Sequence, residues 1–273
     1  MQKFLTHIRP PSGFSLGLRE LWQYRELFYF FTWRDVKVKY KQTYLGIIWA
    51  LLQPLGMMII FTLLFSRNWK IDTSPVHYPV FVLGGLVCWN LFNSAVSHAG
   101  DSMIQHAHII KKIYFPRLII PCSAVLVALV DCMIALIIFL AICIWYHQPI
   151  TVSALIYLPA GILLTILAGT GLGTLLAALN VKYRDFRYAL PFLLQVLFFG
   201  SQVVYPLASI EQGWLKTLLS FNPMNAAIEL FRAPFTGNVD TQVILLGLCT
   251  TILLLITGIF YFRKTENYFA DLA

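Results

Sequence analysis

Charged residues are scarce in this sequence. Asp, Glu, Lys and Arg make up 12% of its 273 residues, whereas about 25% is usual for a soluble domain. Hydrophobic residues account for 59% of the chain, and its mean hydropathy is +0.73. Several charge-free runs reach the ~20 apolar residues that a bilayer-spanning helix requires. The composition therefore excludes an ordinary soluble domain and indicates an integral membrane protein.

Several chemical motifs are also missing. The sequence contains neither a phosphate-binding loop of the form GxxxxGK[ST] nor a CxxC pair. It has no Ser-His-Asp, paired-carboxylate or metal-ligand cluster, so we expect no catalytic residue, metal or cofactor in this chain. The N-terminal stretch lacks an apolar core with a cleavage site, so we expect no signal peptide. The cysteines are odd in number and are interpreted as buried thiols: Cys88, Cys122, Cys132, Cys143 and Cys249.

Charge-free intervals predict six transmembrane helices. The spans are 46–66, 79–99, 118–146, 152–179, 189–205 and 241–262. The third and fourth are separated at His147-Gln148-Pro149, because the interval 118–181 is long enough for two spans. The third span exceeds ~20 residues, so it is tilted or begins outside the hydrocarbon. We predict an all-α membrane protein in which residues 1–273 form a single transmembrane domain.

Lys and Arg are unevenly distributed between the connecting segments. If the N-terminus is cytoplasmic, sixteen of them fall on that side, in 1–45, 100–117, 180–188 and 263–273, and four on the other. Cytoplasmic loops are enriched in Lys and Arg. The asymmetry predicts that both termini are cytoplasmic, and it accounts for the net charge of +8 without a nucleic-acid partner.

The N-terminal stretch LGLRELWQYRELFYFFTW (16–33) has hydrophobic residues near helical spacing and charges toward its beginning. An amphipathic helix in the inner membrane interface fits this pattern, with aromatic side chains at headgroup level. Its candidate interface residues are Arg19, Trp22 and Arg25. The basic stretch 34–41 then leads directly into the first span.

Gln53 and Pro54 interrupt that first span. Proline removes a backbone hydrogen bond and can kink a transmembrane helix. A kinked and partly polar helix suits a position beside a channel, so this pair is the first sequence feature that indicates transport.

The segment 206–240 contains two helix signals. Ser209-Ile-Glu-Gln212 fits a capping box, and Asn222-Pro223 fits an N-cap followed by proline at the first helical position. Pro206 begins the segment, and Gly237 ends the second helix. Helices of this length are too short to span a bilayer. We therefore predict two short re-entrant or interfacial helices that form a gate on the outer side.

Three further features have structural interpretations. Gly169 and Gly173, four residues apart in an apolar helix, predict close helix packing through small residues. Glu229 and Arg232 are three residues apart and could pair on one helix. Asp131 is the one acidic residue deep in a span, and both a functional carboxylate and a hydrogen-bonded packing residue remain open.

Seven segments are spread over nearly the whole chain: WRDVKVKYKQTYLGIIWALLQPL (33–55), WNLFNSAV (89–96), IIKKIYFPRLIIP (109–121), VKYRDFRYALPFLLQ (181–195), VVYPL (203–207), NPMNAAIELFR (222–232) and RKTENYFADL (263–272). Together, and in this order, they resemble the permease subunits of ABC-type polysaccharide exporters, the group that moves lipid-linked O antigen, capsule or teichoic acid. The resemblance implies a homodimer in the bacterial inner membrane and two separate ATP-binding subunits that hold the ATP and magnesium.

The resemblance also implies roles for particular residues. A coupling helix over 100–113 and the loop 182–187 would contact the ATPase through His108, Ile109, Ile110, Lys111, Lys112, Lys182, Tyr183, Arg184, Asp185 and Arg187. The first and fifth spans would line a channel, with Trp49, Gln53, Phe61, Phe192, Phe198, Phe199 and Tyr205 as candidates. The outer gate would contain Pro206, Asn222, Pro223, Glu229 and Arg232.

Other functions remain as alternatives. An ion-coupled carrier should show repeated halves and several buried ionisable groups, and Asp131 has no counterpart. A membrane-embedded glycosyl or acyl transferase would need a catalytic cluster that is missing. Within the ABC class, an exporter of a drug or small lipid fits the same fold, because fold alone does not set the substrate.

Overall fold

The computed structural model describes residues 18–41, 46–66, 73–110, 112, 115–183, 185–210 and 213–266; for residues 18–20, 46–50 and 66 it describes the backbone alone. All regular structure in these ranges is helical. The helices are α1 (Leu18–Gln23), α2 (Arg25–Lys41), α3 (Gly46–Phe61) with a π-helical turn η1 (Thr62–Ser66), α4 (Tyr78–Gln105), α5 (Ala107–Ile110), α6 (Ile119–Trp145), α7 (Ala154–Lys182), α8 (Phe186–Phe199), the 3₁₀ turn η2 (Leu207–Ser209), α9 (Trp214–Ser220), α10 (Pro223–Thr236) and α11 (Thr241–Thr265).

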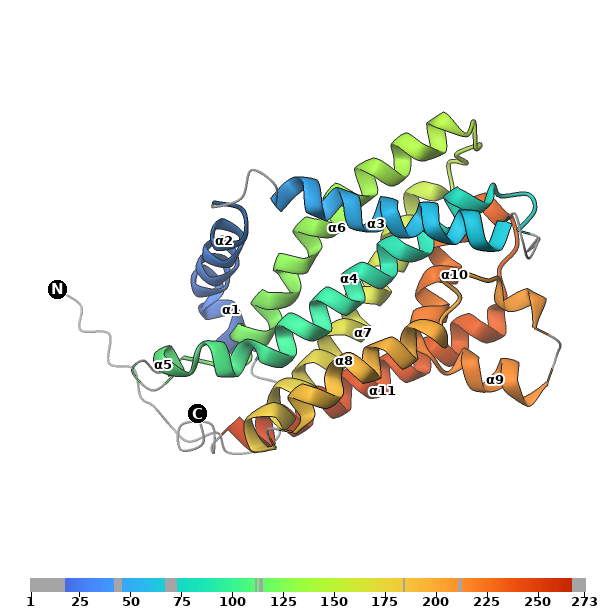
Figure 1. Cartoon of the computed structure of the whole chain (residues 1–273). Helices are drawn as coiled ribbons and strands as arrows, with labels where there is room; N and C mark the ends of the chain where they lie inside the picture. Colours follow the sequence, from blue (N-terminus) through green and yellow to red (C-terminus); the bar gives the residue numbers. More distant parts are fainter. Residues whose placement is uncertain are drawn as a thin grey trace.

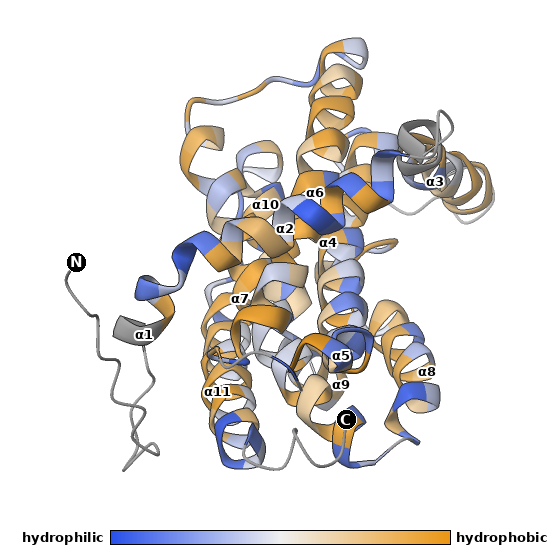
Figure 2. Cartoon of the chain, turned by 90° about the vertical axis from the view of Figure 1, so that its left-hand side faces the viewer, coloured by the Kyte–Doolittle hydropathy of each residue, from blue (hydrophilic) through white to orange (hydrophobic). Residues whose placement is uncertain are grey.

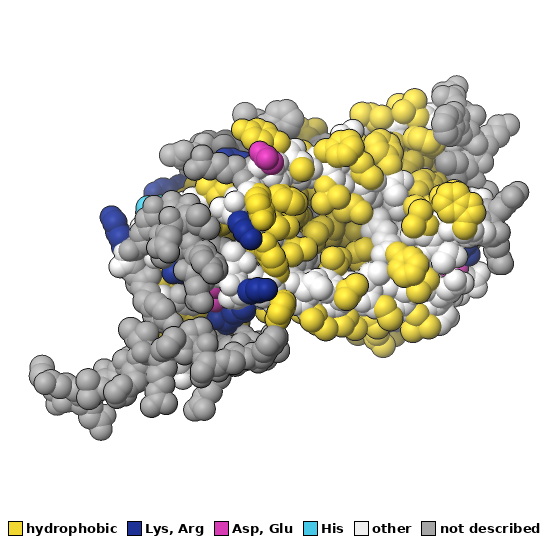
Figure 3. Space-filling model, turned by 90° about the horizontal axis from the view of Figure 1, so that it is seen from below, with side chains coloured by type: hydrophobic (Ala, Val, Ile, Leu, Met, Phe, Trp, Pro, Cys, Tyr) yellow, Lys and Arg dark blue, Asp and Glu magenta, His cyan; other side chains and the backbone are white. Residues whose placement is uncertain are grey.

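The bundle has two different ends (Figure 1). We call one the charged end: it contains α2, α5, the start of α8 and the end of α11. We call the other the α9 end, and it also contains the start of α4. Seen from below (Figure 3), hydrophobic side chains cover the middle and right of the molecule, while Lys and Arg gather toward the charged end. An apolar band with charge concentrated at one end is the surface expected of a membrane protein.

Four of the described helices are long and apolar enough to cross a membrane: α4, α6, α7 and α11. They match the predicted second, third, fourth and sixth spans. The helices α3 and α8, at the predicted first and fifth spans, are shorter. With 14 residues, α8 is about 21 Å long, less than the ~30 Å thickness of the hydrocarbon core.

The centre of the bundle is formed by α4 and α7. A Cβ atom on Gly169 of α7 would lie 3.0 Å from the Cβ of Ala95, and one on Gly173 would lie 2.8 Å from the Cβ of Ala99. Both alanines belong to α4, so the predicted packing through small residues is confirmed. An even closer approach joins α7 to α11, where a Cβ on Gly258 would meet the carbonyl oxygen of Gly171.

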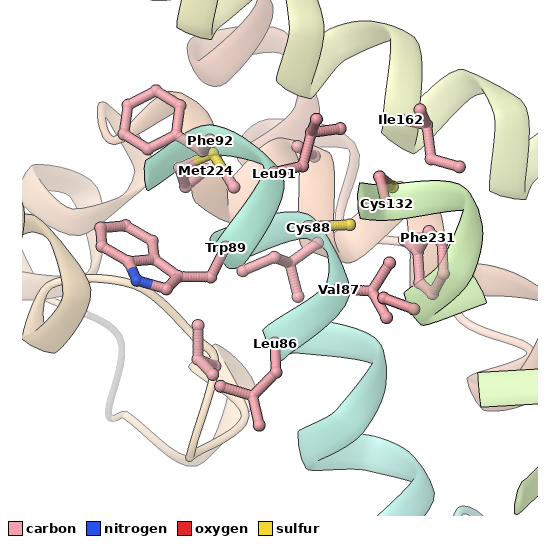
Figure 4. Close-up of a cluster of buried hydrophobic side chains, with 14 of the residues drawn as sticks. Leu86, Val87, Cys88, Trp89, Leu91, Phe92, Cys132, Ile162, Met224 and Phe231 are labelled. Atoms are coloured by element: carbon pink, nitrogen blue, oxygen red, sulfur yellow. The ribbon is translucent and has the colours of Figure 1, made fainter. Parts of the chain in front are cut away.

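Apolar side chains fill the space around α4 on the side facing α6, α7 and α10. Figure 4 shows Val87 and Cys88 of α4 among Cys132 of α6, Ile162 of α7 and Phe231 of α10. All five of these residues are buried, and Ile162, the most exposed of them, is 7% exposed, so this side of α4 is fully occupied by the protein itself. The cysteines of the chain are free thiols; Cys249 is exposed on α11, and the prediction of a buried thiol is wrong there.

Two predicted helix ends differ from the structure. The fifth span was expected to reach residue 205, but α8 ends at Phe199. The first gate helix was expected to start at Ser209, yet Ser209 Oγ donates to the Pro206 carbonyl, 2.7 Å away, and closes the turn η2 instead. Helix α9 begins at Trp214, after Gly213, and residues 211–212 lie outside the described part. The capping-box prediction is therefore wrong.

The second gate helix begins and ends as predicted. The Asn222 side chain accepts a hydrogen bond from the Met224 amide at 3.0 Å, with Pro223 at the first helical position. Gly237 has φ 70° and provides the left-handed C-cap. Local capping chemistry was sufficient to place this helix.

At the charged end, helical structure is distributed differently from the predictions. The N-terminal helix was expected over 16–33, but α1 and α2 continue to Lys41 with an interruption at Tyr24. The expected coupling helix 100–113 is divided, because α4 continues to Gln105 and α5 has only 4 residues. His106 causes the interruption: its side-chain Nδ1 donates to the Ser102 carbonyl at 2.8 Å while its backbone caps α4.

Candidate functional site

A buried arginine organises the α9 end. Arg232 of α10 is 5% exposed, and its guanidinium donates to the backbone carbonyls of Phe81 (Nη2, 2.6 Å), Gln202 (Nη1, 2.5 Å) and Val203 (Nη2, 2.8 Å). Its Cζ lies 3.4 Å from the centroid of the Phe81 ring. Gly85 leaves room for this group, since a Cβ there would be 2.5 Å from Nη2. Arg232 thus joins α10, α4 and the segment that follows α8.

That segment, residues 200–206, has no regular structure, so its backbone groups require other partners. Polar side chains of α10 supply them. Asn225 accepts from the Gln202 amide at 2.6 Å and donates to the carbonyls of Gly200 (3.1 Å) and Leu219 (2.8 Å). Asn222 also donates to the Gly200 carbonyl, at 3.1 Å. Irregular backbone in a membrane protein is tolerated where it is buried in protein, and these bonds meet that condition.

The predicted pairing of Glu229 with Arg232 is wrong, because the two side chains bind different groups. Glu229 accepts from Gln202 Nε2 at 2.9 Å and from the Asp240 amide at 3.2 Å. Asp240 caps α11 and forms an ion pair with Lys216 of α9 at 2.9 Å. The hydrogen bond from Lys216 lowers the pKa of Asp240 below its usual value. The chain of contacts links α9, α10 and α11.

Three aromatic residues meet beside this network. The ring of Phe61 in α3 lies 6.1 Å from that of Phe198 in α8, and Trp89 of α4 lies 5.2 Å from Phe198. We call these three residues the aromatic closure. Phe199 continues it, with its ring 5.6 Å from Phe198. Of the predicted channel residues, the structure therefore brings together Phe61, Phe198 and Phe199.

The remaining channel candidates are separated. Phe192 is 70% exposed on α8, and Gln53 is exposed on α3, which continues through Pro54. The Tyr205 hydroxyl donates to the Phe199 carbonyl at 2.9 Å, so Tyr205 braces the end of α8. Trp49 lies in α3, and its side chain is outside the described part.

Asp131 has partners on the N-terminal helix. Lys39 Nζ lies 2.5 Å from Asp131 Oδ2, and the Tyr40 hydroxyl donates to Oδ1. Because Lys39 and Tyr40 lie in the last turn of α2, the carboxylate holds the C-terminal end of this helix. Asp131 is near the middle of α6, so the first half of this helix lies beside α2. This position favours the prediction that the third span begins outside the hydrocarbon.

A second contact holds α2 against the end of α4. The Arg34 guanidinium lies against His106 Nε2, and Phe31 packs edge-on against the same imidazole, 5.7 Å between centroids. Burial lowers the pKa of His106, as does the nearby Arg34 charge, although the bond to the Ser102 carbonyl opposes them. An imidazole that donates from Nδ1 to a carbonyl and accepts at Nε2 from a guanidinium carries its one proton on Nδ1, and the two contacts of His106 fit this tautomer.

The candidate coupling residues lie on exposed surface at the charged end. His108 and Lys112 are exposed, Ile109 is half-buried, and Ile110 packs into the protein. In the second group Lys182, Tyr183, Asp185 and Arg187 are exposed. Lys111 and Arg184 lie outside the described part.

The candidate interface residues lie at the other end of the N-terminal helices. Trp22 is 71% exposed in α1, and Arg25 lies over its ring at 5.8 Å from the centroid. Only the backbone of Arg19 is described.

Several residues of this arrangement were missed from the sequence. Trp89, Gln202, Asn225, Arg34 and His106 all make contacts that join helices. For Gln202 the sequence did hold a signal. Ser201 and Gln202 lie inside the predicted fifth span, and polar residues within an apolar run require protein partners. The other four are ordinary in sequence and acquire their roles only through long-range contacts.

The fold and these contacts define a multi-span helical membrane protein. In the described residues no group of three His, Cys, Asp or Glu side chains could hold a metal ion. The chain matches the ABC-2 type transporter family over residues 26–236 and belongs to that family. This family supplies permease subunits of ABC transporters.

Several relatives cover almost the whole chain. It is 28% identical to an O-antigen export system permease protein RfbA of Myxococcus xanthus, over 93% of this chain and 98% of that protein. A Klebsiella pneumoniae protein of the same name is 25% identical over 88% and 92%. The polysialic acid transport protein KpsM of Escherichia coli is 26% identical over 86% and 91%.

Replacing Arg232 by lysine should destabilise the α9 end. A lysine keeps the charge but cannot reproduce the planar fork to three carbonyls, and each carbonyl left unsatisfied costs about 1–3 kcal/mol. We expect Arg232→Lys to lower the thermal unfolding midpoint in detergent clearly. The same exchange at Arg187, whose side chain is 57% exposed, serves as the control. Equal midpoints for Arg232→Lys and Arg187→Lys would contradict the role assigned to Arg232.

The contact between Asp131 and Lys39 should be restorable by exchanging the charges. Asp131→Lys alone places two like charges together and should loosen α2, whereas Asp131→Lys with Lys39→Asp restores the attraction. A hydrogen bond to a charged group contributes about 1.5–3 kcal/mol, so the double variant should recover much of the lost thermal stability. Lys37→Asp with Asp131→Lys is the matched control, since Lys37 lies over Trp33. If both double variants recovered thermal stability equally, the contact between Asp131 and Lys39 would not be specific.

Proposed function

We propose that this chain is the transmembrane subunit of an ATP-driven exporter of lipid-linked polysaccharide, O antigen in particular. The polymer would move from the cytoplasmic to the outer side of a bacterial inner membrane. The observation that carries this proposal is similarity over 93% of the chain to an O-antigen export permease. Relatives named for polysialic acid transport and capsule polysaccharide export support the same class of cargo.

The proposed topology has six spans and both termini in the cytoplasm. The charged end would face the cytoplasm, because Lys37, Lys39, Lys182, Arg187 and Arg263 lie there and positive charge favours that side. The α9 end would face outward. Helices α3 and α8 would be the first and fifth spans, and α9 and α10 would form the outer gate.

A second copy of the chain would cover the exposed faces of α3 and α8. Leu52, Ile59 and Leu63 of α3 are 50%, 53% and 57% exposed. On α8, every residue from Phe186 to Ala189 is exposed, and Leu190 and Leu194 are its buried positions. A homodimer with α3 and α8 near its axis would bury these faces and place the aromatic closure beside the path.

ATP and magnesium would be bound by a separate partner subunit at the charged end. The exposed residues of α5 and of the stretch before α8 would contact it. Helix α2 would connect this ATPase-contacting surface to the transport path. Its Arg34 binds His106 beside α5, and α3 is the next helix in the chain. ATP would drive transport because the partner contacts the chain differently in two states.

An ion-coupled mechanism is disfavoured by the environment of Asp131. Such carriers use intramembrane carboxylates that exchange ions or protons. Here Lys39 and Tyr40 both bind the carboxylate, which favours a structural role. Of the two interpretations of Asp131, the hydrogen-bonded packing residue therefore has the better support.

The proposal is tested by purifying the tagged chain with a candidate ATP-binding subunit and by deleting its gene. Copurification, and loss of surface polysaccharide with lipid-linked polymer accumulating inside, are expected. Lys112→Glu should weaken ATPase binding, whereas Lys216→Glu at the α9 end should not. Normal surface glycan in the deletion strain would refute the proposed function.

A further inference from the structure

Helix α4 changes character between Trp89 and Asn90. Every residue from Val80 to Trp89 is buried. From Asn90 onward, one side of the helix remains buried while the other is partly exposed. Ala95 and Ala99 on the buried side contact Gly169 and Gly173 of α7. From Asn90 to its end, α4 therefore has one side that the other described helices cover only in part.

The uncovered side is polar. With 3.6 residues per turn, positions 90, 94, 97 and 101 recur on one side of the helix, with 93 and 98 next to them. We call these residues the α4 polar face: Asn90, Asn93, Ser94, Ser97, His98 and Asp101. His98 is exposed and the other five are half-buried. The Ser94 hydroxyl lies 3.3 Å from His98 Nδ1, and the described structure contains no side-chain hydrogen bond for Asn90, Asn93 or Ser97.

Lipid is an unsuitable neighbour for this face. Unsatisfied polar groups are costly in hydrocarbon, and intramembrane polar residues face protein or a water-filled cavity. Most exposed residues of the long helices α6, α7 and α11 are apolar, as with Ile137 of α6 (69%) and Leu253 of α11 (60%). The contrast between the two kinds of exposed surface indicates that the α4 polar face is turned toward water or a polar ligand.

Two helices flank the α4 polar face and meet at one end of it. Helices α3 and α8 lie on either side of α4 (Figure 1), and Figure 2 shows them separated with hydrophilic residues of α4 between them. They meet at Phe61 and Phe198, and Trp89 directly precedes the polar face. The aromatic closure thus bounds the polar face toward the α9 end, and the face extends from it toward the charged end.

The chemistry of the face suits a polyhydroxylated chain. Amides, hydroxyls and an imidazole both donate and accept hydrogen bonds, as sugar hydroxyls do. Charged groups lie at the end nearest the charged end: Asp101 Oδ1 lies 3.6 Å from Arg187 Nε of α8, and the Lys39–Asp131 ion pair acts electrostatically on His98. Many weak neutral contacts allow a ligand to enter and leave, which a conducting path requires.

We propose that the α4 polar face is a binding surface for the glycan of the exported polymer, on the cytoplasmic side of the aromatic closure. This inference rests on the proposed function and adds α4 to the helices that contact the substrate. The glycan would exchange hydrogen bonds from one turn of α4 to the next as it advances.

The test is thiol labelling of the exporter, with its ATPase, in inverted membrane vesicles. Ser94→Cys and Ser97→Cys are made in a Cys249→Ser background, which removes the exposed native thiol. A charged, membrane-impermeant methanethiosulfonate reagent should label both and should label Ile137→Cys and Leu253→Cys slowly. Lipid-linked glycan added with ATP should protect the α4 positions.

A functional comparison accompanies the labelling. Ser94→Ala should slow export about fivefold, the effect of losing one hydrogen bond of ordinary strength, whereas Ser94→Thr keeps the hydroxyl and should retain the rate. ATPase binding should be unchanged in both variants.

The outcomes separate this inference from the proposed function. Absence of labelling, or labelling without protection by glycan, in a chain that does export polysaccharide would overturn the inference alone. Failure of the deletion strain to lose surface glycan would remove both. Labelling with protection, together with slow export by Ser94→Ala, would support the inference.

Discussion

The irregular backbone between α8 and η2 is the constraint on which the α9 end depends. Its carbonyls have no helical partners, so they must be bound by side chains within the protein. Arg232, Asn222 and Asn225 of α10 do this, and Phe81 of α4 accepts from the same guanidinium. These bonds end α8 at Phe199, set α10 against α4, and place Phe198 where it meets Phe61 and Trp89. The position of the aromatic closure therefore follows from a requirement of backbone hydrogen bonding.

The charged end is organised by long polar side chains from α2 instead. Arg34 binds His106 beside α5, while Lys39 and Tyr40 bind Asp131 of α6. The helix leads directly into α3, one wall of the proposed path. In the proposed function, a displacement of α5 by a partner subunit would be passed to α2 through the contact between Arg34 and His106. In the proposed function, the path would open toward the charged end and be closed by the aromatic residues toward the α9 end.

The sequence was sufficient for features that depend on composition and local chemistry. Apolar runs located the four long spans, Asn222 and Gly237 bounded α10, and Gly169 and Gly173 marked the contact between α7 and α4. Features that depend on distant partners were not predictable. The end of α8 is set by α10, the partners of Asp131 are about ninety residues away in sequence, and Glu229 bonds to Gln202 rather than Arg232. Ser209 shows that a local pattern can also mislead. Its hydroxyl closes the turn η2, and the capping-box pattern does not distinguish such a turn from the start of a helix.

The central claim is that the exported polymer passes between α3, α4 and α8 through the aromatic closure. Joining Phe61→Cys to Phe198→Cys with a short bis-maleimide in the Cys249→Ser background tests it most directly, because the two rings are 6.1 Å apart. The account predicts that the cross-linked exporter still binds its ATPase but no longer moves glycan, while the singly modified variants do. Undiminished export with α3 and α8 joined at this point would contradict it.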